Sequence, residues 1–302
     1  MYVILGATGH TGRVAAKTLL AEGEQVRALG RSKERLAALA SQGAEPFAGD
    51  NTQPEVLTKA FQGARAVYFM IPPDHTNPAY RAHQSELIRA GAQALEAARI
   101  RYVVVLSSYG ASQQSGTGPV AGLHEMEERF KKIAGLNVLF LRPGYFMENI
   151  LPQVGVIQNF GMMAGPLRDD VACPMIATRD IGAAVADALL KLDFSGHQTR
   201  ELQGHRDLTF GEAARIVGAA IGKPSLLYMR LPDPQVIQAL TQMGMSQNHA
   251  ELICEMAGAI NDGRMRALEP RSAANTTSTS FETFVQDNFV PAFGGKAASA
   301  SH

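Results

Sequence analysis

Cysteine is scarce in this chain of 302 residues, which contains only Cys173 and Cys254. Two cysteines that lie this far apart build no disulfide framework and match no metal-site spacing. We therefore expect both to be ordinary apolar residues. None of the eight histidines is followed by another histidine four residues later, and no metal is predicted.

The chain also lacks an excess of charge, because 28 basic residues balance 28 acidic ones. Proteins that hold nucleic acid non-specifically usually carry a basic surplus, so no nucleic-acid partner is expected. No uninterrupted apolar run reaches the ~20 residues that cross a bilayer, so no membrane partner is expected either. The first predicted strand runs directly into a glycine loop, a pattern unlike that of a signal peptide. We therefore predict a cytoplasmic location.

What the first half of the chain does contain is a regular alternation of β-rich runs and helical patterns. The β-rich runs are nearly continuous in apolar residues, as strands buried on both faces of a parallel sheet are. We therefore predict an α/β fold with a Rossmann-type, doubly wound parallel sheet. The predicted strands are Tyr2–Leu5, Gln25–Leu29, Glu45–Ala48, Ala66–Ile71, Tyr102–Leu106 and Val138–Leu141, and the predicted helices are Thr11–Glu22, Ser32–Ala40, Pro54–Phe61, Pro78–Ala98 and Leu123–Ile133.

The second half of the chain has a weaker pattern and is richer in Gly, Pro and Met. We predict a Rossmann-type domain over residues 1–155 and a smaller C-terminal α/β part over 156–290, with helix 179–192 returning to the first domain. The segments Thr209–Glu212 and Thr279–Glu282 have the Thr-x-x-Glu form of a capping box, which predicts a helix start at each. The small, polar tail over 294–302 is predicted to be disordered.

A glycine-rich segment lies between the first predicted strand and the first predicted helix. In a dinucleotide-binding loop the first glycine permits a tight turn, the second lets the pyrophosphate approach, and the third lets the helix pack on the strand. Free N–H groups at the helix start attract the phosphates. A glycine turn without a ligand is the alternative, but the strand–loop–helix context favours a cofactor site. The segment comprises Gly6, Ala7, Thr8, Gly9, His10, Thr11 and Gly12.

The second predicted strand is followed by Gly30 and Arg31, where an NAD-selective site usually has Asp or Glu. A guanidinium can bind a 2′-phosphate through two hydrogen bonds. Arg31 therefore favours NADP(H) over NAD(H), which makes residues 1–155 a predicted NADP-binding domain and 156–290 a predicted substrate-binding part. The alternative is a solvated surface arginine.

Further cofactor contacts are predicted at the ends of the other strands, because ligands of open α/β sheets lie at the carboxyl ends of the strands. Asp50 could accept a hydrogen bond from the adenine amine. It could instead cap the next helix, although Thr52 with Glu55 suits that task. The predicted contacts are Gly49, Asp50, Ile71, Pro72, Ser107, Pro143, Tyr145 and Phe146.

These motifs resemble the NmrA-like family, an atypical branch of the short-chain dehydrogenase/reductase superfamily. The resemblance covers nearly the whole chain and implies a Rossmann domain with a small, variable substrate-binding part. Its members include NADPH-dependent quinone and dye reductases, and also regulators that bind the cofactor without turnover. The resemblance is carried by the glycine loop, Ser107–Gly110, His124–Glu128, the Arg-Pro…Phe-Met-Glu-Asn stretch within Leu141–Asn149, and Thr276–Phe284.

One departure from typical short-chain dehydrogenases concerns the catalytic Tyr with Lys four residues later. None of the seven tyrosines has Lys at that position, and the matching helix reads His124 to Glu128. This disfavours acid–base oxidation of ordinary alcohols and favours hydride transfer to an acceptor that is already electrophilic. We predict catalytic roles for His124, which could orient the cofactor or donate a proton, and for Tyr145, which could stack on the nicotinamide or acceptor. The alternatives are a structural His124 paired with Glu128, and plain packing of Tyr145 and Phe146.

The leading functional hypothesis is an NADPH-dependent reductase of a small aromatic acceptor such as a quinone, azo compound or related dye, acting as a monomer or homodimer. The alternative is a redox-sensing regulator that binds NADP(H) and contacts a partner protein. Nine of the 12 methionines follow Tyr145. Methionine suits an adaptable apolar pocket, and such a pocket favours the enzyme. The alternative is that these methionines reflect loose core packing.

Overall fold

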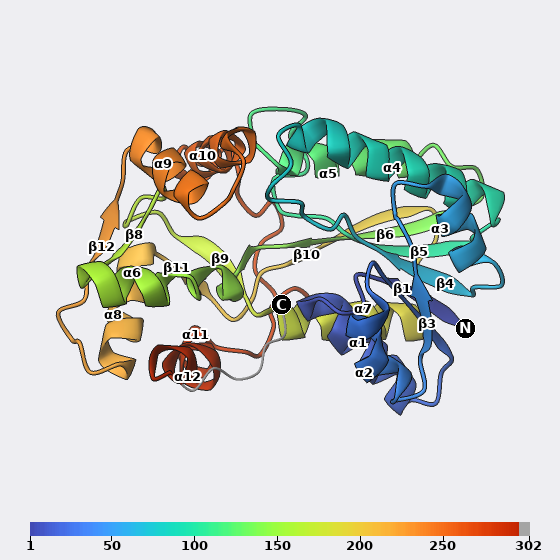
Figure 1. The fold of residues 1–302 in the computed structure, drawn as a ribbon, viewed down its shortest axis with the longest axis horizontal. Helices are drawn as coiled ribbons and strands as arrows, with labels where there is room; N and C mark the ends of the chain where they lie inside the picture. Colours follow the sequence, from blue (N-terminus) through green and yellow to red (C-terminus); the bar gives the residue numbers. More distant parts are fainter. Residues whose placement is uncertain (296–302) are drawn as a thin grey trace.

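Seven parallel strands form the central sheet of the computed structural model, which describes residues 1–295 (Figure 1). Their order is β10-β6-β5-β4-β1-β2-β3, so the direction of winding reverses between β1 and β4. This is the topology of a doubly wound Rossmann sheet, and the predicted fold class is confirmed. The strands are β1 (Tyr2–Leu5), β2 (Val26–Gly30), β3 (Glu45–Ala48), β4 (Ala66–Phe69), β5 (Tyr102–Leu106), β6 (Asn137–Pro143) and β10 (His197–Leu202).

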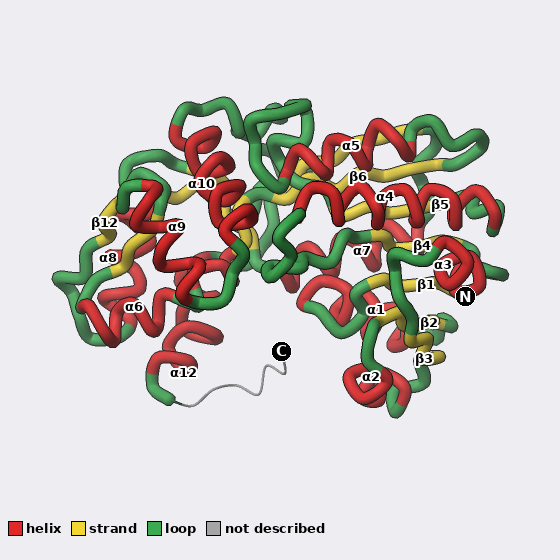
Figure 2. The backbone as a smooth tube through the Cα atoms, turned by 45° about the horizontal axis from the view of Figure 1, so that its top comes forward, coloured by secondary structure: helices red, strands yellow, loops and turns green. Residues whose placement is uncertain are grey.

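Helices cover both faces of the sheet because successive residues of each buried strand point to opposite sides. Tyr2 and Ile4 pack toward α1, α2 and α7, whereas Val3 and Leu5 pack toward α3, α4 and α5. Figure 2 shows the two helical layers on either side of the strands. The helices are α1 (His10–Ala21), α2 (Lys33–Ala40) and α7 (Thr178–Lys191) on one face, and α3 (Pro54–Phe61), α4 (Tyr80–Ala97) and α5 (Val120–Phe130) on the other.

A second group of elements lies beyond the carboxyl ends of the strands, on the left in Figure 1. It contains a three-stranded sheet, β11-β9-β7, and the parallel pair β8 and β12. The boundary predicted at residue 155 falls within α6 and stays a prediction. The elements are β7 (Tyr145–Phe146), α6 (Gln153–Phe160), β8 (Met163–Gly165), β9 (Cys173–Ile176), β11 (Asp207–Leu208), α8 (Phe210–Ala220), β12 (Tyr228–Arg230), α9 (Asp233–Gln242), α10 (Gln247–Asn261), α11 (Phe281–Phe284) and α12 (Val290–Phe293), with short 3₁₀ and π turns at Met147–Ile150 and Val285–Phe289.

The capping box predicted at Thr209 is confirmed at the start of α8. The Thr209 hydroxyl accepts a hydrogen bond from the Glu212 backbone N–H at 3.1 Å, and the Glu212 carboxylate accepts one from the Thr209 N–H at 2.9 Å. The cap expected from Thr52 with Glu55 is wrong, because α3 follows Gln53, which provides no side-chain cap. Proline in the first turn of α3 removes one backbone N–H that a cap would otherwise have to satisfy.

The capping residue predicted at Thr279 is also wrong, by one position. Ser280 precedes α11 and accepts a hydrogen bond from the Thr283 N–H at 3.0 Å. The Thr279 hydroxyl instead donates to the Asp180 carboxylate at 2.7 Å. A tertiary contact therefore removed Thr279 from the role that its local sequence favours.

Some boundaries also differ from prediction, and the tail predicted over 294–302 lies outside the described residues from 296 on. Helix α5 begins three residues before Leu123, at Val120. The seventh strand, β10, was not predicted because it lies at the sheet edge and its first three residues are exposed. Within residues 1–295, no helix combines the length and the apolar character that crossing a membrane requires.

Candidate functional site

The predicted cofactor residues meet at one edge of the sheet. Gly6, Arg31, Gly49 and Ser107 each come directly after a parallel strand, and Pro143 ends another. Because these strands are neighbours and run in the same direction, their carboxyl ends share one edge. This edge is where open α/β sheets bind ligands, and the winding reverses there between β1 and β4.

The glycine loop leaves the first turn of α1 open. Gly9 precedes the helix, and no side chain caps its first turn. A Cβ atom added to Gly12 would lie 2.4 Å from the Gly6 carbonyl oxygen, so only glycine fits there. Gly9 and His10 are exposed, whereas Ala7 is buried and its N–H donates to the Leu29 carbonyl at 3.3 Å. An uncapped helix start that follows a glycine can hold a pyrophosphate.

Thr11 is fixed from inside the protein. Its hydroxyl lies 2.8 Å from the Tyr68 hydroxyl, which comes from β4. A Cβ atom added to Gly182 of α7 would lie 2.7 Å from the Thr11 carbonyl oxygen, so α7 packs closely on the start of α1. The Thr11 side chain is therefore used for packing, and its contact with a cofactor would come from the backbone.

Arg31 stands at the end of β2 with an exposed side chain, and no carboxylate within residues 1–295 pairs with it. The neighbouring acid, Glu34, accepts a hydrogen bond from the Ser32 hydroxyl at 2.6 Å. Ser32 also caps α2 by accepting from the Arg35 N–H at 3.3 Å. The Arg31 guanidinium is therefore available for an anion from outside the chain.

Asp50 is engaged by its own turn. Its Oδ1 accepts hydrogen bonds from the Thr52 N–H at 2.9 Å and the Thr52 hydroxyl at 2.8 Å. The backbone hydrogen bond from Thr52 is the largest cause of a lowered pKa for Asp50. Its contact with adenine stays a prediction. The preceding Gly49 N–H donates to the Gly30 carbonyl at 3.1 Å, which joins the ends of β3 and β2.

A buried ion pair that sequence reasoning missed lies behind Ser107. Glu127 is 1% exposed and accepts hydrogen bonds from the Ser107 hydroxyl at 2.6 Å and from Arg142 at 2.9 and 2.5 Å. A buried carboxylate is tolerated only when it is paired in this way. The pair fixes α5 to the ends of β5 and β6. Its one signal in the sequence was the acidic helix at His124–Glu128.

His124 is hydrogen-bonded to the loop that precedes α5. Its Nδ1 is 2.9 Å from the Ala111 carbonyl oxygen, so this nitrogen carries the hydrogen. The side chain lines a groove of about 840 Å³ between α4 and α5, together with Arg81 and Lys132. Glu128 accepts a hydrogen bond from Lys131 at 2.7 Å, and no hydrogen bond within residues 1–295 joins it to His124. His124 still contributes to the lowered pKa of Glu128, after Lys131, so its pairing with Glu128 stays a prediction. The proton-donor role of His124 stays a prediction.

Tyr145 belongs to an aromatic cluster at the end of the sheet. Its ring meets Phe210 edge-on at 5.3 Å, and Phe210 lies 5.1 Å from the Tyr228 ring. Phe146, the next residue, is half-buried and packs against the core between the central sheet and α1 and α7. Cys173 is buried next to this cluster, and burial raises the pKa of its thiol to about 12. Such a thiol is unreactive, as expected for an apolar residue.

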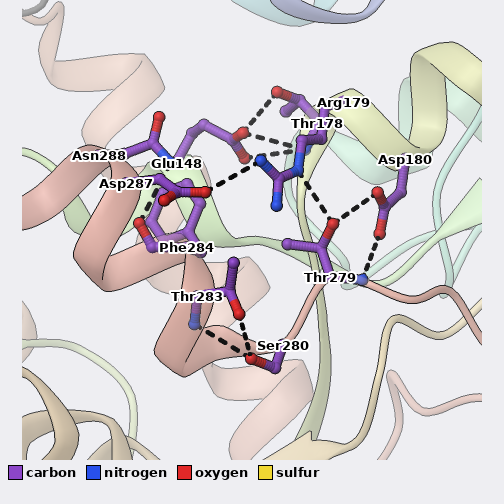
Figure 3. Close-up of polar contacts among 10 residues, drawn as sticks. All are labelled: Glu148, Thr178, Arg179, Asp180, Thr279, Ser280, Thr283, Phe284, Asp287 and Asn288. Atoms are coloured by element: carbon purple, nitrogen blue, oxygen red, sulfur yellow. Dashed lines mark hydrogen bonds and ion pairs between the residues drawn. The ribbon is translucent and has the colours of Figure 1, made fainter.

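The Glu148 carboxylate gives the Phe-Met-Glu-Asn stretch a physical role. It accepts hydrogen bonds from the Thr178 N–H at 3.0 Å and from its hydroxyl at 2.5 Å (Figure 3). The residue that precedes α7, Ala177, has no side chain that could cap the helix, so Glu148 provides the cap. Burial raises the pKa of Glu148. This contact joins the end of β7 to the helix that packs on α1.

The closing segment of the chain is fixed to the same helix. Arg179 donates to the Thr279 hydroxyl at 3.0 Å and to the Asp287 carboxylate at 3.2 Å (Figure 3). Asp180 accepts hydrogen bonds from the Thr279 N–H and hydroxyl. Two of the sequence stretches that carried the family resemblance, around Glu148 and around Thr279, therefore meet at the start of α7.

Comparison with known proteins agrees with this architecture. The model of the NmrA-like family matches residues 2–285. The NAD(P)H azoreductase of Xenophilus azovorans is 28% identical over 260 residues, which are 85% of this chain and 86% of that protein.

Two solved structures have the same fold. The NADPH-dependent quinone oxidoreductase of Escherichia coli, solved with NADPH, has a TM-score of 0.80 at 23% identity and covers 95% of this chain and 99% of that one. The triphenylmethane reductase of Citrobacter sp., solved with NADP(H), has a TM-score of 0.78 at 21% identity and the same coverage. The family match, which spans almost the whole chain, makes this protein a member of the NmrA-like family.

Proposed function

We propose that this protein is an NADPH-dependent reductase that transfers hydride to an electrophilic aromatic acceptor, such as a quinone, azo compound or related dye. The observation that carries the proposal is the open, glycine-lined start of α1 together with the Arg31 guanidinium, which pairs with no carboxylate in the described part of the chain. The named reductases among its relatives support the same reaction class.

The cofactor contacts follow the sheet edge. The loop Gly6–Gly12 would hold the pyrophosphate, Arg31 the 2′-phosphate, and Gly49 with Asp50 the adenine end. Bound there, the dihydronicotinamide supplies the hydride. Its half of the site would be bordered by Ile71, Pro72, Ser107, Pro143, Tyr145 and Phe146.

The protein residues act by positioning. The ion pair of Glu127 with Arg142 fixes the Ser107 hydroxyl, which donates to Glu127 and keeps its lone pairs free for an amide of the ligand. The aromatic cluster around Tyr145 and Phe210 offers apolar surface to a planar acceptor. Because the acceptor is already electrophilic, protons can come from water.

A test of the reaction uses the purified chain, NADPH and a panel of quinones, azo dyes and cationic triphenylmethane dyes. We expect oxidation of NADPH that depends on the acceptor, and faster turnover with NADPH than with NADH. Binding of NADP(H) without oxidation by any acceptor would reject the reductase and favour a regulator. Absence of NADP(H) binding would reject both functions.

The role of His124 is tested separately. Its Nδ1 hydrogen is already used by Ala111, so we expect His124→Ala to lower kcat/KM only severalfold, by loosening the loop before α5. A general acid would be worth ~100-fold or more. A loss of that size, together with disappearance of a near-neutral pKa from the pH profile, would make His124 the proton donor.

A further inference from the structure

One buried hydroxyl beside the candidate site lacks a hydrogen-bond partner. Tyr109 is 4% exposed, and its phenol oxygen has no partner among the described residues. A buried hydroxyl without a partner destabilises a protein, and most buried polar groups are paired. Such a hydroxyl is available to a molecule from outside the chain wherever a binding site lies beside it.

The position of Tyr109 connects it to the nicotinamide end of the site. It follows Ser107 and Ser108 at the end of β5, and its backbone N–H donates to the Pro143 carbonyl at 3.0 Å. Its side chain belongs to the apolar cluster that also contains Cys173, with Tyr145 packed against it. The hydroxyl is thus surrounded by apolar side chains, on a residue that follows the strand end where an acceptor would bind.

Tyr109 differs from the other phenols of this cluster. The hydroxyl of Tyr145 faces the Asn149 side chain, and that of Tyr228 faces the Leu167 backbone. The pKa of Tyr109 is raised, first by burial and then by the nearby Cys173 thiol and Tyr145 phenol. Tyr109 therefore keeps its proton at neutral pH and can only act as a hydrogen-bond donor or acceptor, not as a charged group.

We infer that the Tyr109 hydroxyl donates a hydrogen bond to the acceptor molecule and makes quinones and azo compounds the preferred substrates. This inference rests on the proposed function and names its substrate class. A buried, fixed donor is worth most where negative charge develops during the reaction.

The electron balance separates the acceptor classes. A quinone gains the hydride at one carbonyl oxygen as the C–H bond of the dihydronicotinamide breaks. The electron pair moves through the ring to the other oxygen, which becomes a phenolate and then takes a proton from water. In an azo compound the charge develops on nitrogen instead. A cationic triphenylmethane dye takes the hydride on its central carbon and becomes neutral, so no anion forms and the donor has nothing to stabilise.

The test compares these classes in Tyr109→Phe. We expect kcat/KM to fall by about 100-fold for quinones and azo compounds, as when one donor to a developing anion is removed. For a cationic triphenylmethane dye it should stay within about threefold, because no anion develops there. The midpoint of thermal unfolding should stay the same or rise, since the lost hydroxyl had no partner.

Tyr2→Phe is the matched control. The Tyr2 hydroxyl is also buried without a partner among the described residues, but it lies at the beginning of β1, at the opposite end of this strand from the glycine loop. The same chemical change should therefore leave or raise the unfolding midpoint and leave turnover of all acceptors unchanged.

A binding measurement tests the donor without turnover. The full chain, saturated with NADP⁺, is titrated with 4-nitrophenolate by calorimetry. We expect Tyr109→Phe to bind about 10-fold more weakly, the worth of a hydrogen bond to a charged group, and Tyr2→Phe to bind like the unmodified chain.

Three results would overturn the inference: equal loss for both acceptor classes, an unfolding midpoint lowered by several degrees, or equal phenolate affinity in Tyr109→Phe. If the unmodified chain oxidises no NADPH, the proposed function fails by itself, and the phenolate titration still decides whether Tyr109 is a donor.

Discussion

Arg31 is the residue on which the choice between NADPH and NADH depends. Its guanidinium has no carboxylate partner within residues 1–295. We expect Arg31→Ala to weaken NADPH binding by about 1.5–3 kcal/mol, the worth of a hydrogen bond to a charged group, and to leave NADH affinity nearly unchanged. Calorimetric titration measures both constants, with Arg101→Ala, an exposed arginine just before β5, as the control. Equal losses for the two cofactors would remove Arg31 from the 2′-phosphate.

Two glycines of the phosphate loop should respond differently to a side chain. Gly9 has φ −81° and ψ 177°, which any residue adopts, and an added Cβ would lie 3.2 Å from the Gly6 oxygen. At Gly12 the corresponding distance is 2.4 Å. We expect Gly9→Val to stay folded by circular dichroism but to bind neither cofactor, because the side chain takes the place of the pyrophosphate. Gly12→Val should lower the free energy of unfolding by about 1–3 kcal/mol or more, as overpacking does. Cofactor binding by Gly9→Val would place the phosphates elsewhere.

At the scale of elements, the loop after β4 is joined to the start of α10 by two histidines. Their Nδ1 atoms lie 3.3 Å apart, and the buried His249 ring stacks on Tyr80 at 3.9 Å. The Ser246 N–H donates to the His75 carbonyl at 2.9 Å. This contact fixes the loop that carries Ile71 and Pro72 against the C-terminal group of helices.

The same contact predicts a pH dependence of stability. Burial, followed by the charge of His75, lowers the pKa of His249 to about 4. A histidine that folding keeps neutral contributes its full stability above its unfolded pKa of about 6.5 and loses it as the pH falls toward 4. We expect denaturant unfolding to become easier by about 3 kcal/mol over this range. The slope should shrink in His249→Phe and persist in His205→Gln, an exposed-histidine control. An unchanged slope in His249→Phe would assign the titration to other groups.

Elements could be predicted where local pattern and burial agree. Strands β1 to β6 have apolar runs or turn signals in the sequence. The predicted bounds of all six lie close to those in the structure. Strand β10 was missed because its exposed residues carry no such run. Helix α9 was missed too, since Val236 is its only buried residue and leaves little periodicity. The predicted helix cap at Thr279 was wrong because its hydroxyl donates a hydrogen bond to Asp180, 99 residues away.

At the scale of the whole molecule, the cofactor end of the site was predictable and the acceptor end was not. The roles of the glycine loop and Arg31 can be predicted from a few consecutive residues and from the order of the predicted strands. The pairing of Glu127 with Arg142, the cap that Glu148 gives to α7, and the unpaired hydroxyl of Tyr109 all depend on which distant segments fold together. No local pattern records such contacts.

Deuterium transfer to a cationic triphenylmethane dye tests the proposed reaction most directly. NADPH labelled at carbon 4 of the nicotinamide, on one face and then on the other, is turned over with the purified chain. The hydrogen gained by the central carbon of the dye does not exchange with water, so mass spectrometry of the colourless product records its origin. Direct hydride transfer predicts one deuterium atom from one labelled face and none from the other. A reduced dye without deuterium from either face, or no consumption of NADPH with this or any other acceptor, would contradict the proposed function.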